Sequence, residues 1–162
     1  MPKIQSVVQI DATARGVYEV LTNTAYIIKM FRDAVSVEVD PPGRSVVGQK
    51  HRVVARAGRR KFEMNFEVTE LVPDRKVVTM QLPGGIFNSF WQCTTLQPRG
   101  RKTEARTIFE YELSLGYIGR ALNVVLVKKL ISENLEAYSK TVKELSELVP
   151  LPAPTEAGGL GA

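Results

Sequence analysis

The apolar and polar residues near the C-terminal end repeat with the period of an α-helix. Across residues 117–149, apolar residues recur at steps of three and four, which predicts one apolar stripe along a helix of about nine turns. Pro150 would end this helix, because the residue before a proline is pushed out of the α region. A single helix cannot bury such a stripe alone, so a partner surface is required. The stripe contains Tyr117, Ala121, Val124, Val127, Ile131, Leu135, Tyr138, Val142 and Leu145.

The middle of the chain alternates with period two, which is typical of β-strands. The clearest example is residues 61–72, where Phe62, Met64, Phe66 and Val68 share one face and polar residues share the other. Turns rich in proline and glycine separate consecutive strands. We therefore expect an antiparallel meander that is apolar on one face. The predicted strands are residues 3–10, 35–40, 50–57, 61–72, 76–82, 88–97 and 103–113.

Two short helices are expected between the first strand and the meander. Asp11 or Thr13 can cap a helix that carries Val17, Val20 and Leu21, and a second helix would span residues 25–30. The complete order predicts an α+β helix-grip fold. In this fold, a curved antiparallel sheet of six to seven strands wraps around the long C-terminal helix. Residues 1–149 would form a single domain, and residues 150–162, rich in proline, glycine and alanine, a disordered tail.

Composition narrows the chemistry. One cysteine and one histidine in 162 residues exclude a disulfide framework, a multi-cysteine or multi-histidine metal site, and a His-Glu-x-x-His motif, and we expect no metal or cofactor. The first residues lack the apolar core of a secretory signal, which together with the single cysteine predicts a cytoplasmic protein. The net charge is +5, with basic clusters at residues 56–61 and 99–102. Both clusters surround a glycine, and we interpret them as solvated hairpin tips, with transient contact to an anionic membrane surface as the alternative. No nucleic-acid partner is expected, because the chain lacks a basic and aromatic RNA-binding strand motif.

Three segments resemble the START/Bet v 1-like (SRPBCC) superfamily, in particular its polyketide cyclase/dehydrase-like and coenzyme Q-binding branch. They are the opening VQIDATARGVYEVL of residues 8–21, the strand end TTLQP of residues 94–98, and YELSLGYIGR of residues 111–120 before the last helix. The resemblance covers roughly residues 4–148. It implies a hydrophobic cavity between sheet and helix that holds a lipid, isoprenoid, quinone, sterol or polyketide.

Candidate ligand contacts follow from the predicted faces. His51 shares its strand face with Val53 and Ala55, so it should point inward, where it can bind a ligand or exchange a proton. On the long helix, Asn123, Asn134 and Tyr138 border the apolar stripe and could orient a polar group of the ligand. The loop of residues 83–89, with an exposed Phe87, and the strand start at Lys50 would form the mouth. The predicted ligand contacts are His51, Met64, Phe66, Met80, Phe109, Tyr111, Ile131, Asn134 and Tyr138.

Two functions are compatible with these residues. The first is a module that binds and transports a small lipophilic ligand, for which no catalytic residue is needed. The alternative is a cyclase or dehydratase acting on a polyketide-like substrate, with His51 or Tyr138 as its acid or base. Cys93 is expected to be a small buried hydrophobe, and its use as a nucleophile beside His51 is the minor alternative.

Overall fold

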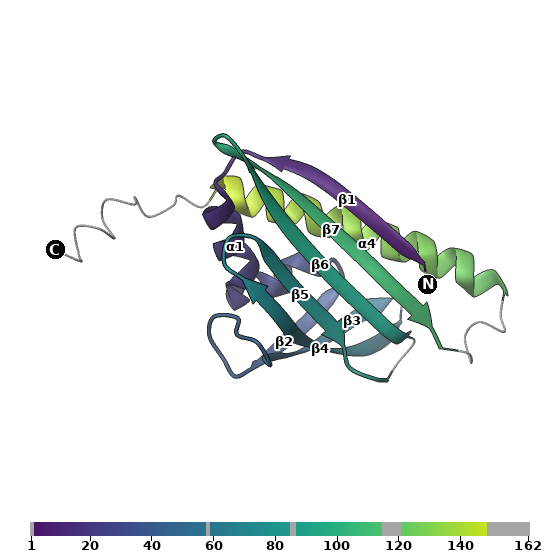
Figure 1. Cartoon of the computed structure of the whole chain (residues 1–162). Coiled ribbons are helices and arrows are strands. Elements are labelled where there is room, and N and C mark those ends of the chain that lie inside the picture. Colours follow the sequence, from purple (N-terminus) through teal and green to yellow (C-terminus); the bar gives the residue numbers. More distant parts are fainter. Residues whose placement is uncertain (1, 58, 85–86, 115–120, 149–162) are drawn as a thin grey trace.

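The computed structural model describes residues 2–57, 59–84, 87–114 and 121–148 (Figure 1). The predicted start of the long helix at Tyr117 and the predicted disordered tail lie outside these residues. The strands are β1 (Lys3–Ile10), β2 (Ala34–Asp40), β3 (Lys50–Ala57), β4 (Arg60–Val72), β5 (Lys76–Gln81), β6 (Phe87–Arg99) and β7 (Lys102–Leu113). The helices are α1 (Ala14–Thr22), the 3-10 turn η1 (Thr24–Tyr26), α2 (Ile27–Met30) and α4 (Ala121–Leu148).

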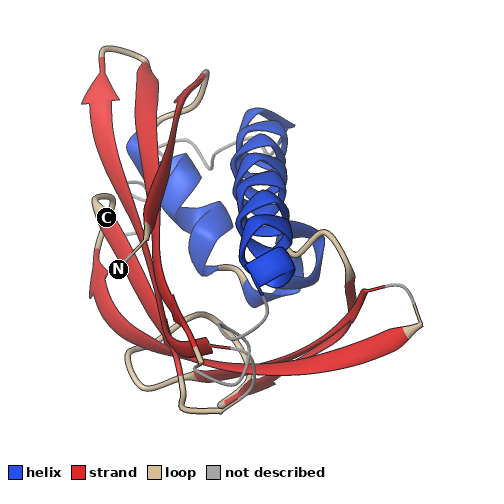
Figure 2. Cartoon of the chain, turned by 90° about the vertical axis from the view of Figure 1, so that its right-hand side faces the viewer, coloured by secondary structure: helices blue, strands red, loops and turns tan. Residues whose placement is uncertain are grey.

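The strands form one antiparallel sheet in the order β1-β7-β6-β5-β4-β3-β2. Strands β2 to β7 follow the chain as a meander, and β1 joins the edge beside β7, where Ile4 pairs with Phe109. The sheet bends strongly, so that its two arms enclose the helices (Figure 2). The predicted helix-grip fold is confirmed. Below, the inner face is the side of the sheet toward the helices, and the outer face is the opposite side.

Helix α1 and the 3-10 turn η1 begin at polar caps. The Thr13 side chain accepts a hydrogen bond of 3.2 Å from the Gly16 N–H, which satisfies an otherwise free donor of the first turn of α1. Asn23 plays the same part for η1, accepting from the Ala25 N–H at 3.0 Å. Helix α1 buries Val17 and Val20 almost completely. These caps explain why the chain leaves β1 as a helix instead of turning into another strand.

The interior contains two clusters. The α1 cluster lies around α1 and the C-terminal part of α4 and includes Ile10, Val17, Leu21, Leu96, Ala105, Tyr138 and Val142. The aromatic cluster lies further along the inner face and contains Val53, Phe66, Phe87, Phe90, Phe109, Tyr111, Leu113, Ile131 and Leu135. The predicted stripe of α4 supplies residues to both clusters, and its members Val127 and Leu145 are partly buried. The helix therefore joins the two clusters along one face.

Candidate ligand site

His51, Phe66 and Gln81 stand side by side on the inner face. His51 pairs with Phe66 across β3 and β4, and Phe66 pairs with Gln81 across β4 and β5. The strand register places the next residue along, Phe90 of β6, beside Gln81, and Phe90 pairs with Tyr111 of β7. Paired residues share a sheet face, and all five side chains are at most 9% exposed. This row of alternating polar and aromatic residues is the candidate site.

Gln49 fixes the position of His51. Its side chain is 0% exposed, and its Nε2 donates to the backbone oxygens of Pro41 at 2.8 Å and Gly43 at 3.2 Å. Its Oε1 lies 2.8 Å from His51 Nε2. Burial lowers the pKa of His51 below its usual value, so the imidazole is neutral at pH 7. The predicted inward orientation of His51 is confirmed, and Gln49 is its supporting residue.

Gln81 is satisfied on one side of its amide only. Its Nε2 donates to the Gly84 oxygen at 2.9 Å, whereas its Oε1 is buried without a hydrogen bond from the residues that the structure describes. The second such atom in that part of the chain is the Ser146 hydroxyl oxygen near the end of α4. A buried unpaired polar group costs about 1–3 kcal/mol. An acceptor kept at that cost among phenylalanine rings is typical of a binding surface.

Aromatic rings surround these polar groups. The Phe66 and Phe90 ring centroids lie 6.2 Å apart, edge to face, although β5 with Gln81 runs between their strands. Phe90 also contacts Phe87 at 5.1 Å and Phe109 at 5.2 Å. The Tyr111 ring lies 5.9 Å from Phe87, and burial raises the pKa of its hydroxyl. The site is thus apolar and aromatic with a few polar atoms, as sites for lipophilic molecules are.

Tyr138 belongs to the other cluster. Its hydroxyl lies 3.5 Å from the Thr94 hydroxyl, which is 3.0 Å from the Thr107 hydroxyl, and all three side chains are buried. Burial raises the pKa of Tyr138, so its hydroxyl stays protonated at neutral pH. The ring still reaches Phe109, at 6.3 Å between centroids. Tyr138 therefore lies at the boundary between the two clusters.

The structure brings most of the predicted ligand contacts to the inner face or to the side of α4 that packs against it, and it places Met80 elsewhere. Phe66, Phe109, Tyr111 and Ile131 belong to the aromatic cluster, and Met64 packs against it. Met80 is 41% exposed and pairs with Trp91 on the outer face, so its expected inward orientation is wrong. The Asn134 amide donates to the Leu130 oxygen of its own helix at 2.8 Å, which occupies one of its donors.

Two further expectations are corrected. Phe87 is 6% exposed and belongs to the aromatic cluster, so it is not the exposed mouth residue that the sequence suggested. Cys93 is also buried, but it pairs with Val78 on the outer face, whereas its neighbour Thr94 points inward. Cys93 and His51 therefore lie on opposite faces of the sheet, which rules out a nucleophile and base pair. Burial raises the pKa of the Cys93 thiol, as expected for an unreactive cysteine.

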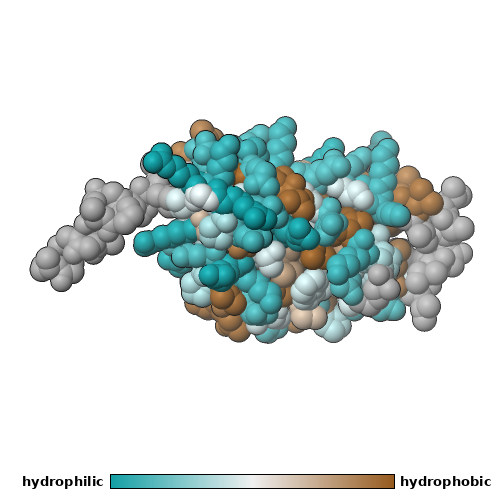
Figure 3. Space-filling model, turned by 45° about the horizontal axis from the view of Figure 1, so that its top comes forward, coloured by the Kyte–Doolittle hydropathy of each residue, from teal (hydrophilic) through white to brown (hydrophobic). Residues whose placement is uncertain are grey.

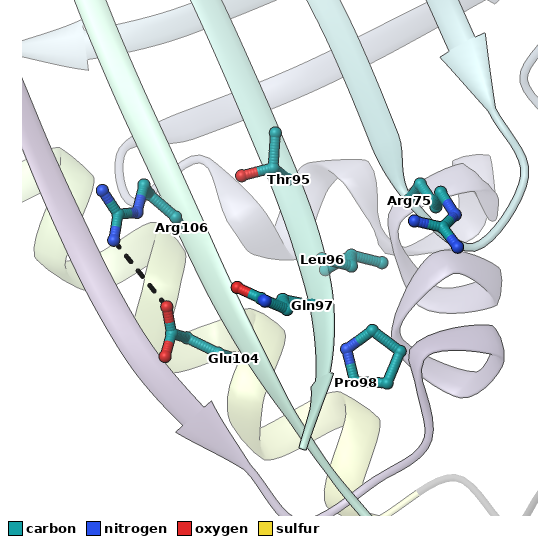
Figure 4. A pocket seen from close by; sticks show the side chains of 7 residues that line it. All are labelled: Arg75, Thr95, Leu96, Gln97, Pro98, Glu104 and Arg106. Atoms are coloured by element: carbon teal, nitrogen blue, oxygen red, sulfur yellow. Dashed lines mark ion pairs between the residues drawn. The ribbon is translucent and has the colours of Figure 1, made fainter. Parts of the chain in front are cut away.

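Two surface hollows are lined mainly by residues outside the aromatic cluster. One, of about 290 Å³, is lined by Arg75 and by residues of β6 and β7 that include Leu96. Its Arg106 and Glu104 side chains form an ion pair of 3.7 Å along β7 (Figure 4). The other, of about 350 Å³, lies between β1 and α4 beside Ile4 and Leu135. Neither is lined by a predicted ligand contact. The interior cavity implied by the family resemblance remains a prediction.

The N-terminal part of α4 exposes apolar side chains. Val125 is 72% exposed, Leu126 57% and Leu130 48%, next to the exposed Lys128 and Lys129. Figure 3 shows hydrophobic surface among hydrophilic surface on the side of the molecule that carries β1 and α4. None of the described helices is long and apolar enough to cross a membrane. The described residues also contain no group of three or more potential metal ligands.

A bent antiparallel sheet that grips a long helix over an aromatic inner face defines the helix-grip class of ligand-binding proteins. A family model described as polyketide cyclase/dehydrase and lipid transport matches residues 1–147. The chain belongs to this family, and the resemblance to START/Bet v 1-like proteins is confirmed. No curated protein matches the sequence significantly.

Solved structures agree with this assignment. The chain is similar to TTHA0849 from Thermus thermophilus, with 25% identity, a TM-score of 0.75, and coverage of 90% of this chain and 97% of that one. It resembles the Zhui aromatase/cyclase from Streptomyces sp. R1128 at 17% identity and a TM-score of 0.77, covering 90% and 93% of the two chains. A START superfamily protein from Mycobacterium smegmatis matches at 18% identity and a TM-score of 0.71, covering 90% and 97%. At 17% and 18% identity, the last two similarities are evidence for the fold alone.

Proposed function

We propose that this protein binds and carries a small lipophilic molecule at the aromatic cluster, between the inner face of the sheet and α4. The observation that supports this most directly is the buried Gln81 Oε1, which lacks a hydrogen bond from the described residues. A core evolved only for stability would replace this amide with an apolar side chain, because unpaired buried acceptors are costly. The surrounding rings offer large apolar contact area to a ligand.

A matched pair of substitutions tests the location. Ala55 lies on the inner face of β3, and its neighbour Val54 lies on the outer face, where it pairs with Glu63. Ala55→Trp should fill space on the inner face and lower uptake of the neutral dye Nile red by tenfold or more, whereas Val54→Trp should leave uptake unchanged. Circular dichroism of both variants verifies folding. Equal uptake by Ala55→Trp and the parent chain would refute a site on this face.

The natural ligand can be found directly. Protein purified from its own source should release a stoichiometric isoprenoid, quinone, sterol, fatty acid or polyketide into an organic extract, detected by mass spectrometry. An empty extract, together with no thermal shift across a panel of such molecules, would contradict the carrier function.

An enzymatic role is the second candidate, and the environment of His51 favours it. A neutral imidazole held by Gln49 on an inner face can accept a proton from a bound substrate. In a cyclase or dehydratase, His51→Phe would abolish turnover of a polyketone thioester and leave its binding within a small factor. In a carrier, neither the parent chain nor the variant would consume the thioester.

Ligand exchange at an anionic membrane surface would fit the exposed part of α4. Apolar Val125 and Leu126 stand next to Lys128 and Lys129, a combination that suits a negatively charged lipid headgroup layer. The protein should sediment with phosphatidylserine vesicles and not with phosphatidylcholine vesicles. Val125→Ser with Leu126→Ser should reduce sedimentation, and binding unaffected by lipid charge or by these changes would exclude this surface.

A further inference from the structure

The hydrogen bonds of Gln49 determine which nitrogen of His51 carries the proton. Gln49 Nε2 lies 2.8 Å from the Pro41 oxygen, 3.2 Å from the Gly43 oxygen and 3.5 Å from the Arg44 oxygen. A flipped amide would point its own oxygen at these three acceptors with no hydrogen between them. The chemistry of the three carbonyls therefore fixes the amide, with Nε2 toward the loop and Oε1 toward His51.

The orientation of this amide makes His51 a hydrogen-bond acceptor toward the interior. Gln49 Oε1 can only accept, so the 2.8 Å contact needs a proton on His51 Nε2. A neutral imidazole carries one N–H, which leaves a lone pair on Nδ1. The described residues give Nδ1 no hydrogen bond, so an acceptor remains on the face that carries Phe66.

Gln81 presents a second acceptor on the same face. Its Nε2 is occupied by the Gly84 oxygen at 2.9 Å, which directs the other end of the amide, Oε1, away from that turn. His51 and Gln81 flank Phe66 in the strand register, about two strand spacings or 10 Å apart along the sheet. Tyr111, further along the row, has a hydroxyl that donates as well as accepts, so it does not discriminate between ligand polarities.

Around His51 and Gln81, the inner face offers no charge to balance an anion. By strand register, the charged residue Arg60 lies on this face, but at the exposed hairpin end of β4, six residues before Phe66. The other described residues that point inward from β3 to β7 are apolar or neutral; those with polar side chains are His51, Thr79, Gln81, Gln92, Thr94, Thr103, Thr107 and Tyr111. A carboxylate placed among them would lose its hydration without a cationic partner, at a high cost. A ketone or ether oxygen would face two acceptors. A hydroxyl group can donate to either of them.

Resting on the proposed function, we propose that this site selects lipophilic alcohols and phenols over their ethers, ketones and carboxylates, through hydrogen bonds donated to His51 Nδ1 and Gln81 Oε1. The hydroxyl hydrogen supplies the bond that Gln81 lacks in the free protein. The Phe66 and Phe90 rings, which meet across Gln81, shift to admit the ligand and then pack against it. Ligand class is thus decided by hydrogen-bond polarity, and apolar area supplies most of the affinity.

Three naphthalenes of nearly the same shape test this selectivity by displacement of Nile red. We expect 2-naphthol to bind about five- to tenfold more tightly than 2-methoxynaphthalene, as one added hydrogen bond gives. The anion 2-naphthoate should bind more weakly than either. Because the single hydroxyl donates to only one of two acceptors about 10 Å apart, Gln81→Leu and His51→Phe each leave one acceptor. The double variant should bring the ratio of naphthol to ether affinity to about one while ether affinity is kept. Gln97→Leu, an exposed glutamine on the outer face of β6, is the control and should keep the parent ratio.

The outcomes separate this selectivity from the binding function itself. A parent chain that takes up neither dye nor naphthalenes overturns the proposed function, and the selectivity falls with it. Uptake with equal naphthol and ether affinities, or a preference for naphthoate, overturns the selectivity alone. A ratio that persists in the double variant of Gln81→Leu and His51→Phe also overturns it, because the acceptors would then lie elsewhere. If this double variant does not fold, Gln81→Met with His51→Leu removes the same two acceptors and decides instead.

Discussion

The α1 cluster and the aromatic cluster lie along the same helix and the same sheet, yet they treat polar atoms differently. Beside the α1 cluster, Thr103 donates to the Ala12 oxygen at 2.7 Å, and Thr22 donates to the Tyr18 oxygen at 2.8 Å. In the aromatic cluster region, Gln81 Oε1 is buried with no partner among the described residues. The first region satisfies these threonine hydroxyls internally, although the buried Ser146 hydroxyl near the end of α4 has no partner among the described residues. The second region leaves an amide oxygen open among aromatic rings.

This difference suggests a division of work within one core. Helix α1 closes the α1 cluster with aliphatic residues such as Val17 and Val20, whose burial contributes stability. The aromatic cluster lies toward the end of α4 where Val125 and Leu126 are exposed. Stability should therefore depend most on the first region and ligand binding most on the second. Substitutions that change stability without changing ligand binding, or the reverse, test that division.

The largest expected effect is on the α1 cluster. Ile10→Ala removes a side chain that is 0% exposed and should lower the free energy of unfolding by about 3 kcal/mol, through lost burial and the cavity that remains. Denaturant unfolding measures this change. Val7→Ala, in the same strand but 44% exposed, is the control and should change stability by less than about 0.5 kcal/mol. Nile red affinity of the folded Ile10→Ala protein should stay the same, and a large loss would break the division.

The two buried glutamines should respond in opposite directions. Gln49→Leu leaves the His51 N–H and the Pro41 and Gly43 oxygens without their partner, and should cost about 2 kcal/mol or more. Gln81→Leu removes an unpaired acceptor and frees only the Gly84 oxygen of an exposed turn, so it should stabilise the protein by about 1 kcal/mol. Urea unfolding of both variants measures the pair. A destabilised Gln81→Leu would mean that this amide is structural.

A smaller effect should appear with pH. Burial lowers the pKa of His51 in the folded protein, so below about pH 6.5 the unfolded chain binds more protons than the folded one. The free energy of unfolding should therefore be highest above about pH 6.5 and decrease as the pH falls below it. Unfolding between about pH 7.5 and about pH 5.5 tests this, since exposed carboxyl groups titrate lower. His51→Gln should flatten the dependence, and an unchanged slope would assign it to other groups.

The smallest effect is expected at the boundary between the clusters. Tyr138→Phe removes a hydroxyl that lies 3.5 Å from Thr94, while Thr94 keeps its 3.0 Å contact with Thr107. The cost should be about 1 kcal/mol or less, because the contact with Thr94 is long and the Gln92 side chain is the other hydrogen-bond partner that is lost. Ligand uptake should stay within a small factor. Thermal unfolding measures the change in stability, and dye binding measures the change in uptake. Loss of dye binding without loss of stability would mean that the Tyr138 hydroxyl contacts the ligand.

Regular patterns made most of the fold predictable. The period of α4 and the alternation in β4 each place one apolar face. The sequence offers Asp11 or Thr13 as the cap of α1, and the structure shows that Thr13 is the cap, accepting from Gly16. Strand β5 lacked such a pattern. In VVTMQ, apolar and polar residues do not alternate, so hydropathy suggested Met80 as the inward residue, whereas pairing with Phe66 places Gln81 there.

The hydrogen bonds and side-chain positions of the candidate site are harder to predict from the sequence than the fold, for a physical reason. The role of Gln49 depends on backbone carbonyl groups up to eight residues earlier, at Pro41. A periodic pattern of apolar residues does not indicate where a loop folds back onto a later residue. Phe87 was misplaced because it follows a proline and glycine turn, where an aromatic residue can equally be exposed or begin a strand. Periodic signals describe faces of regular elements, and this site is built partly from a loop and a single amide.

Pro41 and Gly43, between β2 and β3, act on the proposed ligand site through Gln49. Their carbonyl oxygens decide which way the Gln49 amide points, and that amide decides whether His51 offers a lone pair or a proton to the interior. A relative with a longer or shorter loop could reverse the amide and so prefer carbonyl compounds, with every residue of the inner face unchanged. Selectivity in this architecture can therefore evolve by insertion and deletion at a distance, while the surface that meets the ligand stays the same.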